Sequence, residues 1–409
     1  MNKTVKIGPF SGINNVQSSS ASAFQVSEGK SIAVVAANDV DLNDDGWPTN
    51  RLPIAIDTTI ITPLGGWDIA GRMFYQAADR LYERTTTDIV LISGLVSRVS
   101  ICEHWGLIFV TDGTNHWEID GTTVRVWGLP IPEIVLSPAT GNLVAGQYLV
   151  QCAFIDARGN EGGTSDTELV TLTSATGILV SISNQSPEVV GVNIYVSRRD
   201  QKQTSYLTTV ALGNLPYTII NVDTTIADPP KTLQMTGPIT SAAGIFSFRA
   251  FILMWRDGVV FRSESAEPHL FHGDNFMQFG SDVRACEGVT GKNITGGMWI
   301  GTDNGLWWIQ GEDPSSWLPI RKTFSSVLRG SIRIQGNKIK NLETDDLVAL
   351  FATKSGLVAG MPDGTALHLT DGIYTFPSHA RASFAYVEKA DPLHTTNDLR
   401  QILIGLVED

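Results

Sequence analysis

One segment near the N-terminus has the residue types and spacing of a metal-binding loop. Asp41, Asn43 and Asp45 place oxygen ligands at alternating positions, and Gly46 follows where the chain must bend. This pattern is typical of the first half of a calcium-binding loop, which also needs a bidentate Glu at its twelfth position. The twelfth position here is Leu52. We therefore favour the alternative interpretation, an Asp-rich turn whose carboxylates cap backbone amides.

A second candidate site is the pair His269 and His272, which are separated by two residues. A zinc site would need further ligands close by, and a catalytic one would usually add a Glu on a helix. The segment lacks the helix that would present such a Glu beside the histidines, so we expect a structural pair of histidines on a loop. The sequence also has no phosphate-binding loop, dinucleotide fingerprint or nucleophile elbow. We predict no catalytic, cofactor-binding or metal-binding residue, and we do not expect an enzyme.

The densest basic cluster consists of Arg198, Arg199 and Lys202. It is either the solvated tip of a hairpin or a binding patch, and we favour the tip. The whole chain has a formal net charge of −13. Proteins that grip nucleic acid usually present a basic face. The acidic balance instead favours solubility, or a surface past which DNA slides without binding.

Positioning of these residues depends on strands rather than helices. The segment 298–309 has two short runs of aromatic and branched residues that flank Asn304 and Gly305. An Asn-Gly pair between such runs is typical of a tight β-hairpin. Similar segments occur at 73–84, 107–119, 251–262 and 348–361. No long amphipathic pattern with helix caps accompanies them, so the fold class is predicted to be all-β.

The spacing of the hairpins predicts a repeat. Hairpin starts are 34, 47 and 50 residues apart, except for a gap of 144 residues between 107 and 251. Removing an insertion of about 107 residues restores a spacing of about 37. Repeats of roughly 35–50 residues that are rich in short strands indicate the blades of a β-propeller. We predict about five to seven blades; an irregular all-β protein is the alternative.

The insertion reads as a separate module with about seven short strands. Runs at 145–155, 168–172, 177–183, 191–196 and 205–211 are separated by turn residues. This pattern predicts an Ig/fibronectin type III-like β-sandwich that interrupts the propeller. It either projects outward and makes contacts or is simple decoration. The predicted organisation is an N-terminal arm at 1–31, the first part of the propeller at 32–130, the inserted sandwich at 131–237 and the second part of the propeller at 238–409.

The bulk composition fits an ordered protein with large buried sheets. Apolar residues make up 42% of the chain and charged residues 17%. No apolar run approaches the ~18 residues that a membrane-spanning helix needs, and the first residues lack the apolar core of a signal peptide. Cys102, Cys152 and Cys286 are far apart and odd in number, which predicts buried reduced thiols. We expect folding in a cytoplasm and no membrane span.

The first 55 residues carry a resemblance to a known class of proteins. The opening Gly-Pro-Phe-Ser-Gly-Ile-Asn-Asn at 8–15 is followed by an Asp-rich segment at 37–46 and by Arg-Leu-Pro at 51–53. This succession resembles the N-termini of structural proteins of tailed-phage virions. The remainder resembles the β-propeller tail hub or nozzle proteins of short-tailed phages by architecture only.

The resemblance implies a structural role in a virion tail that is assembled in the host cytoplasm. It implies a homo-oligomeric ring, commonly a hexamer, which lines or seals the genome-exit channel. The expected partners are portal-adaptor or tail-tube proteins, tail fibres or spikes, and genomic DNA in transient passage without sequence-specific binding. Six copies would carry a charge of −78, which would limit DNA binding if the acidic groups face the channel.

Two other functions stay open at this stage. A propeller lectin or glycan-acting enzyme, of a virion or a cell surface, would use carboxylates and aromatic rings at a propeller centre. The Asp-box repeats of sialidases are absent from the sequence, which counts against this alternative. A minor capsid or baseplate protein with the same architecture is a third possibility, because one fold serves many functions.

Overall fold

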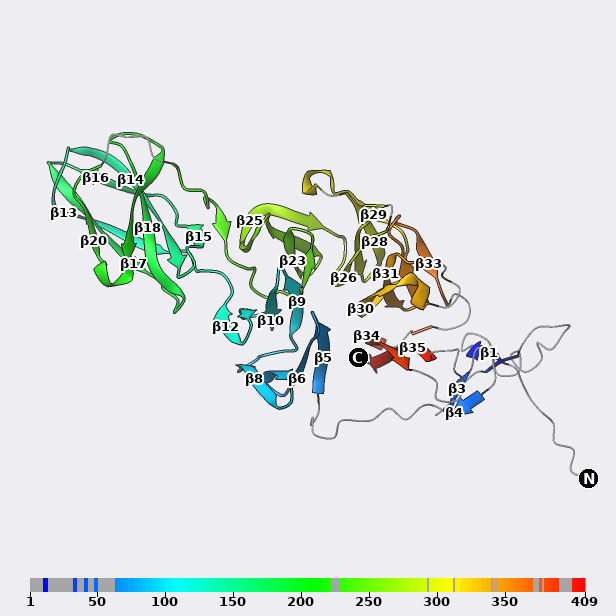
Figure 1. The fold of residues 1–409 in the computed structure, drawn as a ribbon. Coiled ribbons are helices and arrows are strands. Elements are labelled where there is room, and N and C mark those ends of the chain that lie inside the picture. The colour runs from blue at the N-terminus through cyan, green and yellow to red at the C-terminus, as the bar shows by residue number, and fades with distance from the viewer. Residues whose placement is uncertain are drawn as a thin grey trace, which may run out of the picture. The chain divides into compact units, whose positions relative to one another are not determined.

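The computed structural model describes residues 10–13, 32–34, 40–42, 48–50, 63–222, 228–292, 294–311, 313–339, 342, 344–370, 375–376, 379–389 and 399–408. The chain forms two compact units, one of residues 61–278 and one of residues 1–60 with 279–409. The described residues form strands joined by short turns, with three single-turn 3₁₀ helices (Figure 1). The expectation of an all-β chain built from several antiparallel sheets is confirmed.

The 61–278 unit contains three antiparallel sheets in which neighbouring strands follow one another along the chain. Their orders are β5-β6-β7-β8, β9-β10-β11-β12 and β22-β23-β24-β25, the last extended by β21. The bounds of the first sheet are β5 Pro63–Ile69, β6 Arg72–Ala77, β7 Arg80–Arg84 and β8 Asp88–Ser93. Those of the second are β9 Ser100–His104, β10 Leu107–Thr111, β11 His116–Asp120 and β12 Thr123–Val126. Those of the third are β21 Met235–Thr236, β22 Gly244–Phe248, β23 Phe251–Arg256, β24 Val259–Glu264 and β25 Glu267–Gln278.

These sheets stack face to face, because each hydrophobic core draws on two of them. One core joins Phe74 and Leu81 of the first sheet to Ile108 and Ile119 of the second. The next core joins the second sheet to the third and includes Phe109, Ile252 and Met254 among its members. The first strands also lie side by side in chain order, since β5 contacts β9 and β9 contacts β22. Stacked four-stranded sheets of this kind bury both faces of the inner sheet.

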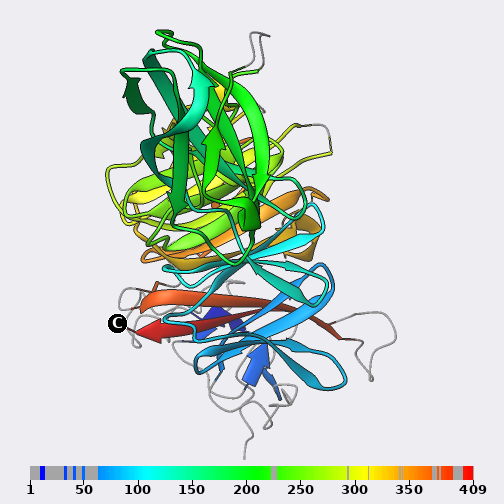
Figure 2. The same ribbon diagram turned by 90° about the vertical axis from the view of Figure 1, so that its left-hand side faces the viewer.

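The second sheet leads into an inserted sandwich, which we define as strands β13 to β20 (Figure 2). One of its sheets has the order β13-β17-β20 and the other the order β15-β14-β18-β19, with β16 also paired to β14. A single core lies between the two sheets and contains Val150, Phe154, Ile178 and Ile194, all fully buried. The bounds are β13 Glu133–Leu143, β14 Gly146–Asp156, β15 Glu161–Thr164, β16 Glu168–Leu172, β17 Thr176–Ser183, β18 Val189–Ser197, β19 Thr204–Ala211 and β20 Tyr217–Ile219.

The other unit, of residues 1–60 and 279–409, also contains antiparallel sheets in which neighbouring strands follow one another along the chain. Strands β26 to β29 form one sheet, and β30 to β33 form another that is extended by β34 and β35. Trp299 and Trp308 of the first sheet pack with Val327 and Phe351 of the second in one core. The bounds are β26 Val283–Val289, β27 Gly297–Thr302, β28 Gly305–Gln310, β29 Pro319–Arg321, β30 Val327–Gln335, β31 Leu347–Thr353, β32 Gly356–Gly360, β33 Ala366–His368, β34 His379–Lys389 and β35 Leu399–Glu408.

Short strands are also assigned in the N-terminal region. They are β1 Phe10–Ile13, β2 Ile32–Val34, β3 Val40–Leu42 and β4 Pro48–Asn50. β1 pairs in parallel with β2, and β3 pairs in antiparallel with β4. Most of the segment that carries the phage-like motifs lies outside the described residues, so the structure adds nothing to that resemblance.

Candidate functional site

The predicted calcium half-loop lies only partly within the structure. Asp41 belongs to β3, whereas Asn43, Asp45 and Gly46 lie outside the described residues. Among the residues that the structure describes, no group of three or more His, Cys, Asp or Glu side chains is arranged to hold a metal ion. The choice between a calcium loop and a capping turn therefore stays a prediction.

The histidine pair lies in strand β25 and not on a loop, which corrects our expectation. This strand, Glu267–Gln278, is the longest in its sheet and contains both histidines. His269 is hydrogen-bonded through Nε2 to the backbone oxygen of Glu161 at 3.2 Å. His272 instead accepts the backbone N–H of Asp274 at its Nδ1, at 3.2 Å. The two side chains therefore have separate partners rather than a shared one.

The basic cluster forms the turn between β18 and β19, as the hairpin-tip interpretation predicted. Arg198, Arg199 and Lys202 are all exposed. The turn is fixed to the start of β14 by Asp200, whose backbone N–H donates to the Gln147 carbonyl at 2.8 Å and whose Oδ1 accepts the Gln147 N–H at 2.9 Å. Three cations on one turn are not by themselves a binding site.

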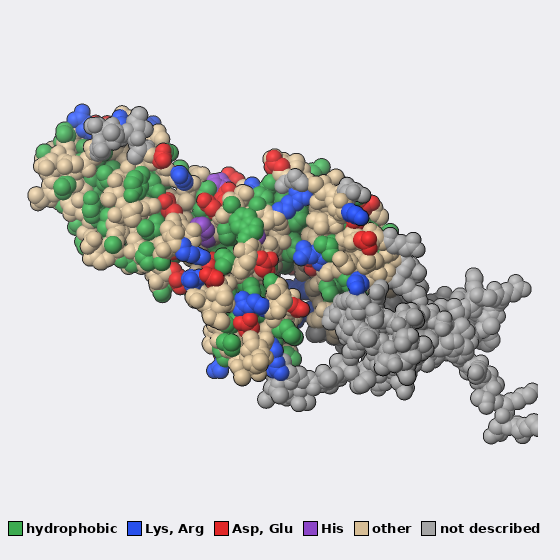
Figure 3. All heavy atoms as spheres, viewed as in Figure 1, with side chains coloured by type: hydrophobic (Ala, Val, Ile, Leu, Met, Phe, Trp, Pro, Cys, Tyr) green, Lys and Arg blue, Asp and Glu red, His purple; other side chains and the backbone are tan. Residues whose placement is uncertain are grey.

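The richest polar arrangement is one that we did not predict. It lies where two chain passages, residues 127–132 and 232–238, connect the inserted sandwich to the sheets of its own unit. The passages touch at Gly128, where a Cβ atom would lie 2.4 Å from Cδ of Pro238 and where φ is +84°. Only glycine suits both the left-handed backbone and this close approach. We call this region the insert junction; basic, acidic and histidine side chains gather on the surface there (Figure 3).

A buried carboxylate forms the first half of the insert junction. Glu118 of β11 is 3% exposed and lies in the second sheet. Arg158, from the turn between β14 and β15 of the sandwich, donates from Nη1 to one of its carboxylate oxygens and from Nη2 to the other, the latter at 3.3 Å. Arg125 of β12 lies 3.8 Å from the same carboxylate. A bidentate pair fixes both distance and orientation, so Arg158 ties the sandwich to the sheet.

Asp156 holds the Arg158 turn in shape. Its Oδ1 accepts the backbone N–H groups of Arg158 and Asn160 at 2.8 and 2.9 Å, and its Oδ2 accepts the Arg158 Nε–H at 3.1 Å. Burial raises the pKa of Asp156, but these hydrogen bonds outweigh burial and place the pKa below its ordinary value. The side chain therefore stays an anion at neutral pH and keeps Arg158 aimed at Glu118.

A second carboxylate, Glu161 of β15, gathers donors from the sandwich and from the returning passage. Tyr195 donates its hydroxyl at 2.8 Å, Asn193 its amide at 2.6 Å and Thr232 its hydroxyl at 3.0 Å. The backbone oxygen of Glu161 is bonded to His269 of β25. Burial lowers the pKa of His269, so the ring is neutral at neutral pH. The contact therefore does not depend on an ionised histidine.

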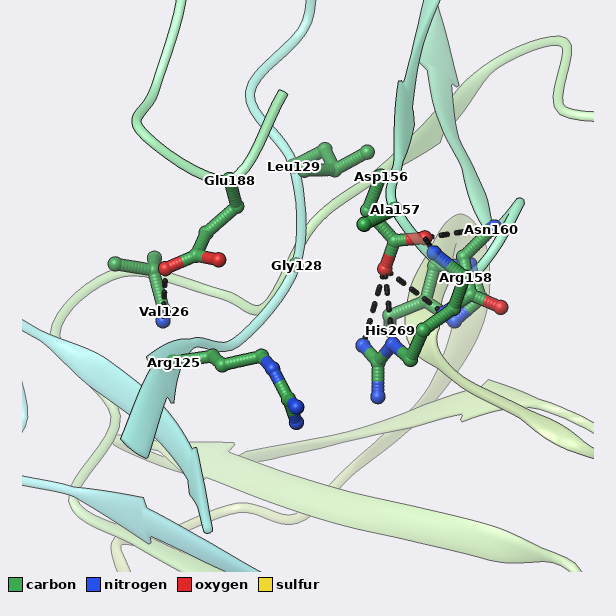
Figure 4. A pocket seen from close by; sticks show the side chains of 10 residues that line it. All are labelled: Arg125, Val126, Gly128, Leu129, Asp156, Ala157, Arg158, Asn160, Glu188 and His269. Carbon is green, nitrogen blue, oxygen red and sulfur yellow. Dashed lines mark hydrogen bonds and ion pairs between the residues drawn. The ribbon is translucent and has the colours of Figure 1, made fainter. Parts of the chain in front are cut away.

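A small cavity of about 50 Å³ lies within this network (Figure 4). Its lining residues are Arg125, Val126, Gly128, Leu129, Asp156, Ala157, Arg158, Asn160, Glu188 and His269. The lining contains no Ser, Thr, Cys or Lys, and its Asp156 carboxylate is occupied by hydrogen bonds from Arg158 and Asn160. Figure 4 shows the Asp156 carboxylate turned toward Arg158, with Glu188 beside the Val126 backbone. The cavity can hold a water molecule, and it is too small for a typical substrate.

A larger groove of about 670 Å³ lies beside the two passages. Val126, Pro130, Pro238, Ile239 and Phe261 supply apolar surface to it. Its polar lining includes His116, Asn184, Gln185, Ser186, Thr236, Thr240 and Arg256, and no acidic side chain lines it. The groove has the size of a ligand site, but no charged pair in its lining is arranged for proton transfer.

The three cysteines predicted to be buried thiols are buried and free of disulfides. Burial raises the pKa of the Cys102 and Cys286 thiols, and it raises that of Cys152 to about 12. These thiols are therefore protonated at neutral pH and are poor nucleophiles. No helix in the described part of the chain is long and apolar enough to cross a membrane.

Comparisons with known proteins leave the family open. No known protein family matches the sequence, and no curated protein is a detectable relative. One similar solved structure is that of Sqt1 from Saccharomyces cerevisiae, at 11% identity. The match covers 70% of this chain and 91% of that chain, with a TM-score of 0.19. A TM-score this low supports no conclusion about shared function or shared arrangement of the sheets.

Proposed function

We propose that this chain is a structural subunit of a bacteriophage tail, a hub or nozzle ring that lines or seals the genome-exit channel. The observation that carries the proposal is the architecture. Four-stranded sheets follow one another in chain order and stack face to face within each unit, and a sandwich is inserted after the second sheet. The sequence resemblance of residues 8–53 to tailed-phage virion proteins gives this architecture its context.

Within this proposal the sheets are the blades of a β-propeller of about five to seven blades. The first strand of each blade lies nearest the propeller axis, which is consistent with the contacts of β9 with β22 and of β26 with β30. The inserted sandwich is taken as Ig/fibronectin type III-like. Tyr195 of β18 is not its core tyrosine, because Val192, Ile194 and Val196 face the sandwich core and the Tyr195 hydroxyl donates to Glu161 instead.

The insert junction supports a mechanical role. Arg158 reaches from the sandwich to a carboxylate in the sheet, and His269 reaches from β25 to the sandwich. The carboxylates of Glu118 and Glu161 both accept hydrogen bonds from neighbouring side chains and are therefore not free to act in catalysis. An arrangement of this kind resists rotation of the sandwich and transmits force, as an anchoring part of a tail would require.

The same proposal places copies of the chain in a ring, with a hexamer expected by resemblance. Portal-adaptor or tail-tube proteins and tail fibres or spikes are its proposed partners, and the virion tail is its proposed location. Genomic DNA would pass without sequence-specific binding. The formal charge of −13 for each copy is consistent with a channel that does not retain a polyanion.

One observation favours a second candidate function, that of a lectin. The 670 Å³ groove combines Phe261 with the amides of Asn184 and Gln185, and such groups bind sugar rings and hydroxyls. Its lining shows no pair of carboxylates that would hydrolyse a glycosidic bond. The groove therefore supports glycan binding better than glycan cleavage.

The mass of the purified protein in solution separates the two candidates. Light scattering should be measured on the protein alone and with candidate adaptor and tube proteins from the same virion. A ring-sized particle, or a monomer that forms rings only on a partner, supports the tail subunit. A protein that stays monomeric in both cases and binds glycans from the host surface contradicts the tail proposal and supports the lectin.

A further inference from the structure

The most exposed apolar side chains in the described structure lie close together in sequence. Phe324 is 79% exposed and Leu318 is 68% exposed, the two highest values among the large apolar side chains described, and Ile320 is 43% exposed. Ile320 is paired with Trp308 of β28 and Arg321 with Trp307, so Ile320 and Arg321 lie on opposite faces of the sheet, and the Phe324 ring lies against Arg321. We call Leu318, Ile320 and Phe324, with Arg321 and Lys322, the β29 patch, because these residues flank one strand on both of its faces. Single exposed apolar residues are normal, whereas a group of them around one strand indicates an interaction surface.

The β29 patch lies on the outer edge of a sheet. β29 is the last strand in the order β26-β27-β28-β29, so one of its edges has no neighbouring strand in that sheet (Figure 1). Pro319, the first residue of β29, removes a backbone N–H from the strand. A proline at an edge disfavours the addition of another strand. A partner of this edge is therefore recognised through side chains rather than by sheet extension.

Arg321 holds the patch in a defined conformation. Its guanidinium Cζ lies 4.2 Å from the centroid of the Phe324 ring and 5.7 Å from that of Trp307. It also donates to the backbone oxygens of Thr323, at 3.2 Å, and Asn304. The exposed ring is thus supported from one side before any partner binds. Preorganised aromatic and arginine side chains are enriched among the residues that dominate binding energy.

The charge of the patch differs from that of the whole chain. The segment from Trp317 to Ser326 contains two cations, Arg321 and Lys322, and no acidic residue, whereas the chain carries −13. Two copies of such an acidic chain repel each other. A stable contact between copies therefore needs apolar area together with local cations that meet the neighbour's acidic surface. The β29 patch supplies both.

We propose that the β29 patch is a contact surface for a second copy of this chain. We choose a second copy as the binding partner for two reasons: the ring proposed above, and the charge complementarity between the patch and an acidic neighbour. In a ring the contact is head-to-tail, so the patch meets a different surface of the next copy. Phe324 and Leu318 supply the apolar anchors, and Lys322 faces acidic groups of the neighbour.

The test measures self-association by light scattering from about 1 to 100 μM protein, for the wild type and for exposed-site variants. Phe324→Asp and Leu318→Asp should each weaken self-association by about tenfold or more, as loss of a central anchor does. Lys322→Glu should weaken it most at low salt, because added repulsion is screened as ionic strength rises. Val135→Asp is the matched control, since Val135 is 67% exposed on the inserted sandwich. It should leave the association unchanged.

The possible outcomes separate this inference from the proposed function. If the wild type and both aspartate variants associate equally, the β29 patch is not the contact surface, and another surface must join the copies of the proposed ring. If the wild type stays monomeric at 100 μM, the proposed self-contact is wrong. The tail proposal is then tested separately, by light scattering in the presence of the candidate adaptor and tube proteins. Circular dichroism of each variant verifies the fold, which these exposed positions should not disturb.

Discussion

Arg158 and Glu118, which are 40 residues apart in sequence, form a bidentate ion pair between the inserted sandwich and the sheet that precedes it. The carboxylate is buried while the guanidinium is partly exposed. Removal of the arginine would leave a buried charge with Arg125 as its nearest remaining cation, at 3.8 Å. The ion pair therefore matters for the free energy of unfolding chiefly because breaking it leaves the Glu118 carboxylate buried without its hydrogen-bonding partner.

We predict that Arg158→Ala destabilises the 61–278 unit by about 2 kcal/mol, because a buried carboxylate loses its hydrogen-bond donors. Hydrogen exchange should become faster in β12 and β15, on the two sides of the insert junction. Lys202→Ala is the control, since Lys202 is exposed on the β18–β19 turn and should change stability by less than about 0.5 kcal/mol. Equal exchange rates in the two variants would show that Arg158 does not hold the junction.

A second prediction concerns Glu287 of β26, which accepts a hydrogen bond from the Ser331 hydroxyl of β30 at 3.0 Å. Burial raises the pKa of Glu287 to about 7, and the Arg333 charge and the Ser331 hydrogen bond only partly offset burial. The ordinary value is 4.5, so the folded state favours the protonated form. This contribution to stability is complete below about pH 4.5 and is lost as the pH rises through 7.

Glu287→Gln should therefore make stability less dependent on pH between 5.5 and 8.5. At pH 8.5 the variant should be more stable than the wild type by roughly 2 kcal/mol, since the amide remains neutral. Urea unfolding of both proteins at several pH values measures the difference. Parallel curves of stability against pH would contradict a role for this carboxyl group.

The five hairpins could be predicted because their information is local. In the structure, two-residue loops join β6 to β7, β23 to β24, β27 to β28 and β31 to β32, and a longer loop joins β10 to β11. The first strand of each sheet was harder to find. β13, for example, contains Pro138 and alternates weakly, and its pairing with β17 depends on a strand more than 30 residues away. Such a strand is defined by its partner rather than by its own pattern.

The insert junction could not be predicted from spacing. His269 and the Glu161 carbonyl are separated by 108 residues, and nothing local to either residue indicates the contact. The only signal in the sequence was a histidine pair, which we interpreted as lying on a loop. Long-range ion pairs and hydrogen bonds arise from the packing of whole modules, which a single sequence does not specify.

A third prediction concerns the cysteines. Cys102, Cys152 and Cys286 are buried and have raised thiol pKa values, so a thiol reagent at pH 8 should label the native protein negligibly. All three should react after unfolding in guanidinium chloride. The variant Lys202→Cys provides an exposed thiol that should react at once, as a positive control. Rapid labelling of the native wild type would show that its cores open readily.

The last prediction concerns Gly360 of β32, which lies against the buried ring of Trp299. A Cβ atom at Gly360 would lie 2.6 Å from that ring, and Trp299 is fully buried with its indole N–H bonded to the Met361 carbonyl at 3.1 Å. Gly360→Ala should therefore destabilise the protein by about 1–3 kcal/mol, because the ring has no space to move.

Gly273→Ala is the matched control, because a Cβ atom at Gly273 of β25 would contact nothing within 4 Å. It should change the free energy of unfolding by less than about 0.5 kcal/mol. In a Trp299→Leu background, which provides space, the cost of Gly360→Ala should fall, and a double-mutant cycle from urea unfolding measures that coupling. An unchanged cost in that background would mean that the clash with Trp299 is not the cause.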